Sequence, residues 1–491
     1  MKSKQNNQSK PKTVRRCRTV MVMLLIIALV IPQAVLAANE GQGAESVSAP
    51  LLTAGDPISI TLSKSLASNA ENGYEVSGSI LTFNANAHGK AYIISQETGH
   101  GFTTITVSNN VNADITINSI SMNSFALSAG ANVNLALKGN NTMSYGLRVP
   151  SNATVSIDDN GDKTAKLTAA GYYNCAAIGG GAMRESCGTI NILGGTITAN
   201  GGGNAAAIGG GCFASGGNIT ISGGTVTANG IVGGAGIGGG HGGNGGTIKI
   251  TGGTVTANQT NAASTAGTGA GIGGGTDAAG GAITISGGTV KAAAVDGAAI
   301  GMGADEGNNG NRANDTNIKI TGGTVTATAS GRGAAIGGGR RYGGGTIEIS
   351  GAANVTATGG NSASGGAGIG SGYDGGAGAK LTLASTATVK AYSRNTACQA
   401  INAASVSGDA YFINAQLNTE RTAVTKLKAY GPDGAGVNTD LSLPANYPNF
   451  AYTTGSAQPQ ENYILAFNDS TNIFEGMIVP TLNNEGNTIC T

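Results

Sequence analysis

The chain of 491 residues contains no tryptophan, only 10 prolines, and few aromatic or charged side chains, at 4% and 11% respectively. So few large side chains would leave the core of a single compact globule poorly filled. The low proline content, without a glycine at every third position, excludes a collagen triple helix. Because 40% of the residues are hydrophobic, the scarcity of charge does not indicate a disordered chain.

Basic residues are scarce outside the first 37 positions. Seven of the 27 Lys and Arg side chains lie there, which leaves 20 basic against 26 acidic side chains in the rest of the chain. The formal net charge of +1 therefore conceals a mildly acidic protein. Such a surface gives no reason to expect nucleic acid or an anionic membrane as a partner.

A short apolar run lies near the N-terminus, at residues 20–31, between a basic segment and the small-residue sequence Val35-Leu36-Ala37. This order of segments predicts a secretory signal peptide over residues 1–37. About 12 apolar residues are too few for a helix that spans a membrane, which needs roughly 20. We therefore expect an exported chain, secreted or associated with the cell surface, with no membrane span after cleavage.

Glycine is abundant, at 85 residues, and much of it falls within a repeat that runs from about residue 175 to residue 404. The sequence Thr-Ile-Lys-Ile-Thr-Gly-Gly-Thr-Val-Thr-Ala-Asn at 247–258, followed by Ala-Gly-Ile-Gly-Gly-Gly at 270–275, recurs with small changes. A repeat of about 20–50 residues is typical of stacked units that cannot bury an apolar face alone. The threonine that opens the second half recurs at Thr196, Thr225, Thr254, Thr289 and Thr324.

Aligned repeats place aliphatic residues in columns separated by polar positions. Strict alternation of β-branched and polar residues predicts strands with one buried face, and the intervening Gly-Gly predicts a bend. Stacked strands would place like residues on one another roughly 4.8 Å apart. We predict an all-β, right-handed parallel β-helix. Two of the columns are Ile190, Ile219, Ile248, Ile283, Ile318, Ile347 and Leu381, and Ile197, Val226, Val255, Val290, Val325, Val355 and Val389.

Two other repeat architectures fit the sequence less well. A leucine-rich solenoid needs Leu-x-x-Leu-x-Leu spacing, which these units lack, and none of them shows a helical apolar period. A propeller blade needs four strands in about 40–45 residues, which is more than these units contain.

Changes in composition predict four segments along the chain. The signal peptide is followed by a small and polar lead-in at residues 38–55, and the β-helix occupies residues 56–407. Alternating runs around Ile115, Val133 and Val155 indicate tighter turns of the solenoid before the regular repeats. At residues 408–491 glycine becomes rarer and Tyr, Phe and Pro appear, which predicts a small β-rich C-terminal cap or module on a monomer.

The combination of Gly-Gly-Thr-Val-Thr-Ala-Asn with Gly-Ala-Gly-Ile-Gly-Gly-Gly resembles Gly-rich repeats in exported surface proteins of Gram-positive bacteria. Those proteins are similar to the pectate-lyase-like β-helix superfamily. The stretches at residues 112–120 and 135–143 also resemble a β-helix carbohydrate-binding domain of cellulolytic clostridia. The resemblance covers residues 70–405 and implies contact with a surface polysaccharide.

Unusual side chains collect a few residues past the Gly-rich strand of each unit. Asp277, Asp305 and Asp374 share a Gly-x-Gly-x-Asp pattern similar to the calcium turns of repeat-in-toxin proteins. Because Asp277 and Asp305 lie on adjacent units, we expect that they could share a calcium ion. The alternative is that these carboxylates are solvated corners without a ligand.

Two further groups of residues suggest contact with a glycan. Thr198, Thr227 and Thr256 would stack into a flat outward array that could lie along a polysaccharide, although β-propensity alone also favours threonine there. Tyr342 and Tyr373, in the loops, could stack on sugar rings.

Five cysteines follow the signal peptide, and an exported chain permits disulfides. Cys187 and Cys212 lie in loops of neighbouring units, so we predict a disulfide between them. Zinc on these cysteines is not expected, because no Cys-x-x-Cys or paired histidine accompanies them.

Residues suited to catalysis are sparse. Only seven acidic residues lie between residues 189 and 393, and the three histidines are scattered along the chain. A polysaccharide lyase or hydrolase needs clustered carboxylates, often with a basic residue or calcium. We therefore expect a non-catalytic protein that binds extracellular polysaccharide, with an enzyme whose site is unrecognised, or a structural spacer or adhesin, as the alternatives.

Overall fold

The computed structural model describes residues 56–99, 103–181, 183–260, 268–306, 315–361, 363–395, 397–416, 426–430, 436–442, 447, 449–455, 463–467 and 474–478. The predicted signal peptide, the lead-in and Cys490 lie outside these residues. Within the described part of the chain, no helix has the length and apolar character needed to cross a membrane.

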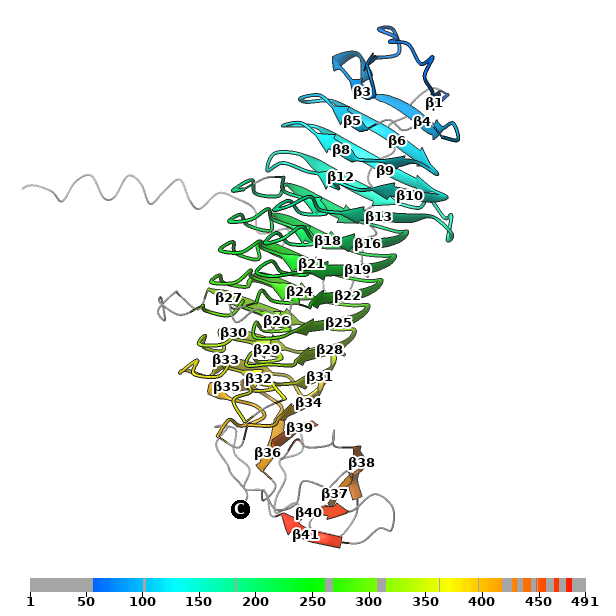
Figure 1. Cartoon of the computed structure of the whole chain (residues 1–491). Coiled ribbons are helices and arrows are strands. Elements are labelled where there is room, and N and C mark those ends of the chain that lie inside the picture. The colour runs from blue at the N-terminus through cyan, green and yellow to red at the C-terminus, as the bar shows by residue number, and fades with distance from the viewer. Residues whose placement is uncertain are drawn as a thin grey trace, which may run out of the picture. The chain divides into compact units, whose positions relative to one another are not determined.

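The described chain winds through three long sheets, so that each regular turn contributes one strand to each of them (Figure 1). Sheet 1 contains β1 (Ile58–Leu62), β4 (Lys90–Gln96), β6 (Asn112–Asn118), β9 (Asn132–Lys138), β12 (Thr154–Asp158), β15 (Thr189–Ile192), β18 (Asn218–Ile221), β21 (Thr247–Ile250), β24 (Gly281–Ile285), β27 (Thr316–Ile320), β30 (Thr346–Ile349), β33 (Ala379–Leu383) and β35 (Ala403–Gly408).

Sheet 2 contains β7 (Ser121–Met122), β10 (Asn140–Met143), β13 (Lys166–Ala170), β16 (Thr196–Asn200), β19 (Thr225–Gly230), β22 (Thr254–Gln259), β25 (Thr289–Ala294), β28 (Thr324–Ala329), β31 (Asn354–Thr358), β34 (Thr388–Ser393), β39 (Asn449–Gly455) and β36 (Tyr411–Gln416). Sheet 3 contains β2 (Tyr74–Ser77), β3 (Ile80–Phe83), β5 (Thr104–Val107), β8 (Ser124–Leu127), β11 (Leu147–Arg148), β14 (Ile178–Gly179), β17 (Ile208–Gly209), β20 (Ile237–Gly238), β23 (Ile272–Gly273), β26 (Ile300–Gly301), β29 (Ile336–Gly337) and β32 (Ile369–Gly370). A 3-10 helix, η1 (Ala85–Ala87), precedes β4.

The sheets are parallel and in register throughout the regular repeats. Ile219 pairs with Ile248, and Ile248 pairs with Ile283, so each residue lies beside its counterpart in the next turn. Each turn therefore consists of a sheet 1 strand, a bend, a sheet 2 strand, a loop and a short sheet 3 strand. The prediction of an all-β parallel β-helix is confirmed.

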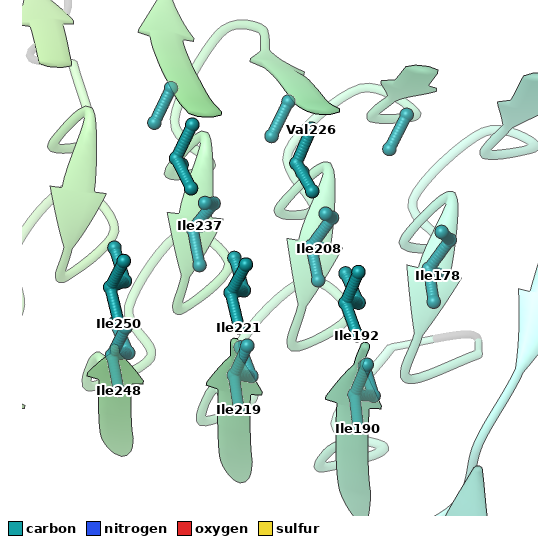
Figure 2. Packing of buried hydrophobic residues seen from close by; sticks show 14 of the residues in the cluster. Ile178, Ile190, Ile192, Ile208, Ile219, Ile221, Val226, Ile237, Ile248 and Ile250 are labelled. Carbon is teal, nitrogen blue, oxygen red and sulfur yellow. The ribbon is translucent and has the colours of Figure 1, made fainter. Parts of the chain in front are cut away.

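The core is a set of stacked aliphatic columns inside the three sheets. Ile190, Ile219 and Ile248 form one column, and Ile192, Ile221 and Ile250 form a second beside it (Figure 2). All of these side chains are buried. Each isoleucine that leaves water in this way contributes roughly 2 kcal/mol to stability, before the entropy of ordering is counted.

Glycine is required at two kinds of position in each turn. Gly253 follows β21 with a φ of 77°, which provides the bend that the Gly-Gly pair predicted. Gly238, the second residue of β20, has a φ of 132°, and a Cβ there would lie 2.0 Å from the carbonyl oxygen of Gly273 in the next turn. The Ile-Gly strands of sheet 3 can therefore stack on one another only because glycine follows isoleucine.

The turns before residue 175 are shorter but join the same sheets, as the alternating runs predicted. In these turns the residues that pair between strands are not the ones that the spacing of the large apolar residues alone would align. Val133 pairs with Ala113 and Val155, whereas Ile115 pairs with Leu135. A small alanine thus occupies a column that larger aliphatic residues fill elsewhere.

The last parallel strand of sheet 2, β34, is covered by an antiparallel strand rather than by another turn. β39 pairs with β34 and β36 pairs with β39. The Thr453 hydroxyl accepts a hydrogen bond from the Val389 N–H at 3.0 Å and donates to the Ala387 carbonyl at 3.1 Å. These bonds satisfy backbone groups of the edge strand that would otherwise be unpaired. A separate antiparallel sheet contains β37 (Lys426–Tyr430), β38 (Gly436–Ser442), β40 (Tyr463–Phe467) and β41 (Phe474–Ile478).

Replacement of Ile250 by Asp should abolish cooperative folding, because the carboxylate would be buried in an aliphatic column without a partner. Thr256→Val, on the outer surface of the same turn, should change the free energy of unfolding by less than about 1 kcal/mol. Thermal unfolding followed by circular dichroism measures both effects. A soluble Ile250→Asp protein with an unchanged transition would contradict the column assignment.

Candidate functional site on the corner loops

The corner loops, defined as the segments that directly follow the Ile-Gly strands of sheet 3, are joined to one another by a ladder of backbone hydrogen bonds. From Ile208 to Ile336, the N–H of the fifth residue after the isoleucine donates to the carbonyl of the fourth residue after the next isoleucine. Phe213 donates to His241 at 2.8 Å, and Asp277 donates to Ala304 at 2.9 Å. Side chains from successive corner loops are thereby brought into one column on the surface.

A second ladder holds each corner loop from its other side. The His241 N–H donates to the Asn204 carbonyl, and the Thr276 N–H donates to the Gly233 carbonyl, both at 2.8 Å. These acceptors lie in the segments that connect sheet 2 to sheet 3. Because both sides are hydrogen-bonded, the backbone of the corner loops is fixed by the solenoid.

In most corner loops, the fifth residue after the isoleucine of the sheet 3 strand has a left-handed backbone conformation. The φ angles are 61° at Phe213, 59° at Asp277, 68° at Arg341 and 56° at Asp374. This conformation is uncommon for residues other than glycine, and its repetition identifies a constrained turn. The turn directs the sixth residue inward, since Ala214, Ala278 and Tyr342 are all buried.

Three metal-ligating side chains meet where three consecutive corner loops stack. One ligand atom each from His241, Asp277 and Glu306 lies within 4.8 Å of the others. His241 Nε2 is 3.6 Å from Glu306 Oε1. The Glu306 N–H donates to Asp277 Oδ1 at 2.9 Å, which fixes the two carboxyl-bearing residues relative to each other.

The His241 imidazole is held by packing. Its ring lies edge-on to Phe213 with the centroids 5.2 Å apart. Gly233 lies against the ring, and a Cβ at that position would be 2.6 Å from His241 Cδ2. Among the described residues, His241 Nδ1 is buried without a hydrogen-bond partner. The other nitrogen, Nε2, is the one that lies close to Glu306.

The aspartates of the predicted calcium site differ in their surroundings. Asp277 belongs to the cluster, but Asp305 is only 2% exposed and is not one of its members. Asp305 has no positive φ, so it occupies the buried position of its loop, and the next residue, Glu306, occupies the exposed one. The alternative that the Asp305 carboxylate is a solvated corner is therefore wrong. Asp374 is exposed on a loop three turns from Asp277.

Asp305 lies instead beside a largely buried ion pair. Arg340 Nη1 is 3.3 Å from Asp296 Oδ2, and Arg340 Nη2 donates to the Asp305 carbonyl oxygen at 2.9 Å. Asp296 Oδ1 also accepts a hydrogen bond from the Arg332 N–H at 2.9 Å. This network joins a corner loop to the segments beside it and has a structural role.

The predicted disulfide between Cys187 and Cys212 is wrong, because both are free thiols in the structure. The Cys187 N–H donates to the Ser215 carbonyl, whereas the Cys212 carbonyl accepts from the Arg184 N–H. The two cysteines are therefore at different positions of their loops. Cys187 follows Ile178 by nine residues, whereas Cys212 follows Ile208 by only four.

The predicted threonine array is present on the outer surface of sheet 2. Thr198 pairs with Thr227, and Thr227 pairs with Thr256, in adjacent strands. All three side chains are partly exposed. Lys291 occupies the next position, and Thr326 and Thr356 continue the column beyond it. We call this column the threonine ladder.

The aromatic residues available to a ligand differ from those expected. Tyr342 is only 4% exposed, so it cannot stack on a sugar, whereas Tyr373 is partly exposed. Tyr145 and Tyr172 are 50% and 61% exposed, and their ring centroids are 4.8 Å apart. Both lie in segments that follow sheet 2 strands of consecutive turns. The sequence analysis missed this pair, although each tyrosine follows a predicted strand in one of two consecutive turns, and that placement could have revealed it.

Sequence reasoning also missed the grouping of His241 and Glu306 with Asp277. These residues follow Ile237, Ile272 and Ile300 by four, five and six positions, a diagonal across consecutive repeats. When the repeats are aligned position by position, these three residues fall in different columns. A comparison that moves one position along the loop with each successive repeat would have grouped them.

Four segments of the chain match a family described as a β-helix repeat, at residues 190–212, 219–241, 283–304 and 318–340. Each segment spans one strand of every long sheet, which is one full turn. These four segments are β-helix repeats, in agreement with the parallel β-helix of the structure. No curated protein and no solved structure matches it. Because one fold supports many functions, the function of this chain depends on its surface residues.

Cys187 should be unreactive in the folded protein. Burial raises the pKa of its thiol to about 12, so the thiol stays protonated at about pH 8, where alkylating reagents need a thiolate. Partly buried Cys175 should react faster under these conditions, and Cys187 and Cys212 should both be alkylated after unfolding without reductant. Mass spectrometry of the peptides measures this. A peptide pair linked through Cys187 and Cys212 would contradict the assignment of free thiols.

Proposed function

We propose that the protein is a secreted or cell-surface, non-catalytic β-helix protein that binds an extracellular polysaccharide. The observation that supports this most strongly is the threonine ladder, in which side chains repeat at the strand spacing of about 4.8 Å. Each threonine presents a hydroxyl that can donate and accept hydrogen bonds and a methyl group that can contact a sugar ring. A flat, repetitive surface of this kind suits an extended, repetitive ligand.

The exposed tyrosine pair lies in the segments that follow two strands of the same sheet. Tyr145 follows β10 and Tyr172 follows β13, and these strands carry Thr142 and Thr168 in register with Thr198. Tyrosine rings provide flat apolar faces with a polar edge, which suits the face of a pyranose ring. A glycan chain that follows the threonine ladder as far as β13 and β10 would thus come close to the rings of Tyr172 and Tyr145.

The location belongs to the same proposal. The basic, apolar and small-residue order of residues 1–37 supports export. The resemblance to Gram-positive surface repeats and to the pectate-lyase-like superfamily supports attachment to, or contact with, a bacterial cell surface. The mildly acidic composition is compatible with a neutral or basic polysaccharide.

One observation favours an enzyme as a second candidate. A histidine close to two carboxylates is a combination that can perform general acid–base chemistry, and His241 lies close to Asp277 and Glu306. Depolymerisation of a polysaccharide is therefore the outcome that would replace binding as the function.

A polysaccharide array, probed with the full chain, tests the proposal. We expect retention on at least one polysaccharide without release of shortened products. Thr227→Lys should weaken that retention by about tenfold, or about 1.4 kcal/mol, because the long side chain would lift a glycan from the ladder. The fold should tolerate this change, since Lys291 already occupies the same column.

Thr220→Lys is the matched control. It adds the same charge to the same turn but on sheet 1, where Lys249 occupies the neighbouring position. Its retention should equal that of the unchanged protein. Equal loss in both variants would show a general charge effect and contradict binding at the ladder, and shortened products would show an enzyme.

A further inference from the structure

We propose that His241, Asp277 and Glu306 bind one divalent transition-metal ion, of which zinc is the representative, across three consecutive turns of the solenoid. The proposal does not depend on glycan binding. It rests on the juxtaposition of one imidazole and two carboxyl groups, whose ligand atoms lie within 4.8 Å of one another.

The distances suit a shared cation better than a direct contact. At 3.6 Å, His241 Nε2 and Glu306 Oε1 are farther apart than a hydrogen-bonded pair. Two ligands that each lie about 2.1 Å from a tetrahedral zinc ion are separated by about 3.4 Å. A cation between the three groups would also offset the repulsion between two neighbouring carboxylates.

The three side chains project from a backbone that is already fixed. The His241 and Asp277 amides take part in the corner-loop ladders, and Asp277 Oδ1 also accepts the Glu306 N–H. The His241 ring is confined between Phe213 and Gly233. Little conformational entropy would then be lost on binding, which favours affinity.

The donor set distinguishes this site from the calcium site expected from the sequence. Calcium takes six to eight oxygen ligands, and imidazole nitrogen is typical of zinc and other late first-row metals. One nitrogen and two carboxylates provide three protein ligands, with further positions left for water. Three protein ligands are typical of zinc sites that keep a coordination position open, whereas structural zinc sites have four.

Calorimetric titration of the full chain, first stripped of metal with EDTA, tests the proposal with zinc chloride and calcium chloride as probes. We expect zinc to bind with one ion per chain, more tightly than calcium, and to raise the melting temperature. His241→Gln, Asp277→Asn and Glu306→Gln should each lower zinc affinity by more than about tenfold. Their melting temperatures in EDTA should change by only a few degrees, because all three side chains are at least partly exposed and asparagine tolerates a left-handed backbone.

Asp374→Asn is the matched control, because Asp374 has the same loop position and a φ of 56° but lies outside the cluster. It should leave zinc binding unchanged. Cobalt binding, followed by absorption spectroscopy, separates this site from the free cysteines, since a near-ultraviolet charge-transfer band appears only with thiolate ligands. Absence of zinc binding, affinity that survives all three cluster variants, equal loss in Asp374→Asn, or a thiolate band would each overturn the proposal.

Discussion

The parallel hydrogen bonding that joins each turn to the next in strict register is the interaction on which the rest of this structure depends. It places isoleucine on isoleucine inside, glycine on glycine in sheet 3, and threonine on threonine outside. A slip of one residue would turn every aliphatic column toward water. The sequence repeats because each position meets the same surroundings in every turn.

The regular strands were predictable because their side chains obey this register. Ile219, Ile248 and Ile283 align in the sequence and pair in the structure, and the outward threonines follow from the same alternation. The corner loops were less predictable, because one inserted residue or one change of backbone conformation alters which side chain faces water. Cys187 and Cys212 follow the isoleucines of their turns by nine and four residues, so they lie at different places in their loops, and the absence of a positive φ at Asp305 exchanges the roles of Asp305 and Glu306.

The solenoid provides two kinds of surface with different chemistry. The sheets vary little from turn to turn, so they present long uniform arrays such as the threonine ladder. The corner loops vary in side chain while their backbone stays hydrogen-bonded, so they can bring distinct groups together across turns. An extended polymer suits the first kind of surface, and a compact ligand such as a metal ion suits the second.

The central claim is that register between turns brings residues about 30 positions apart into one functional group. A crystal structure of the full chain grown with zinc, with anomalous diffraction measured at the zinc absorption edge, tests this claim most directly. We expect an anomalous peak within about 2.1 Å of His241 Nε2 and of carboxylate oxygens from Asp277 and Glu306. A map in which these three residues lie on separate parts of the surface, or in which zinc binds only elsewhere, would contradict it.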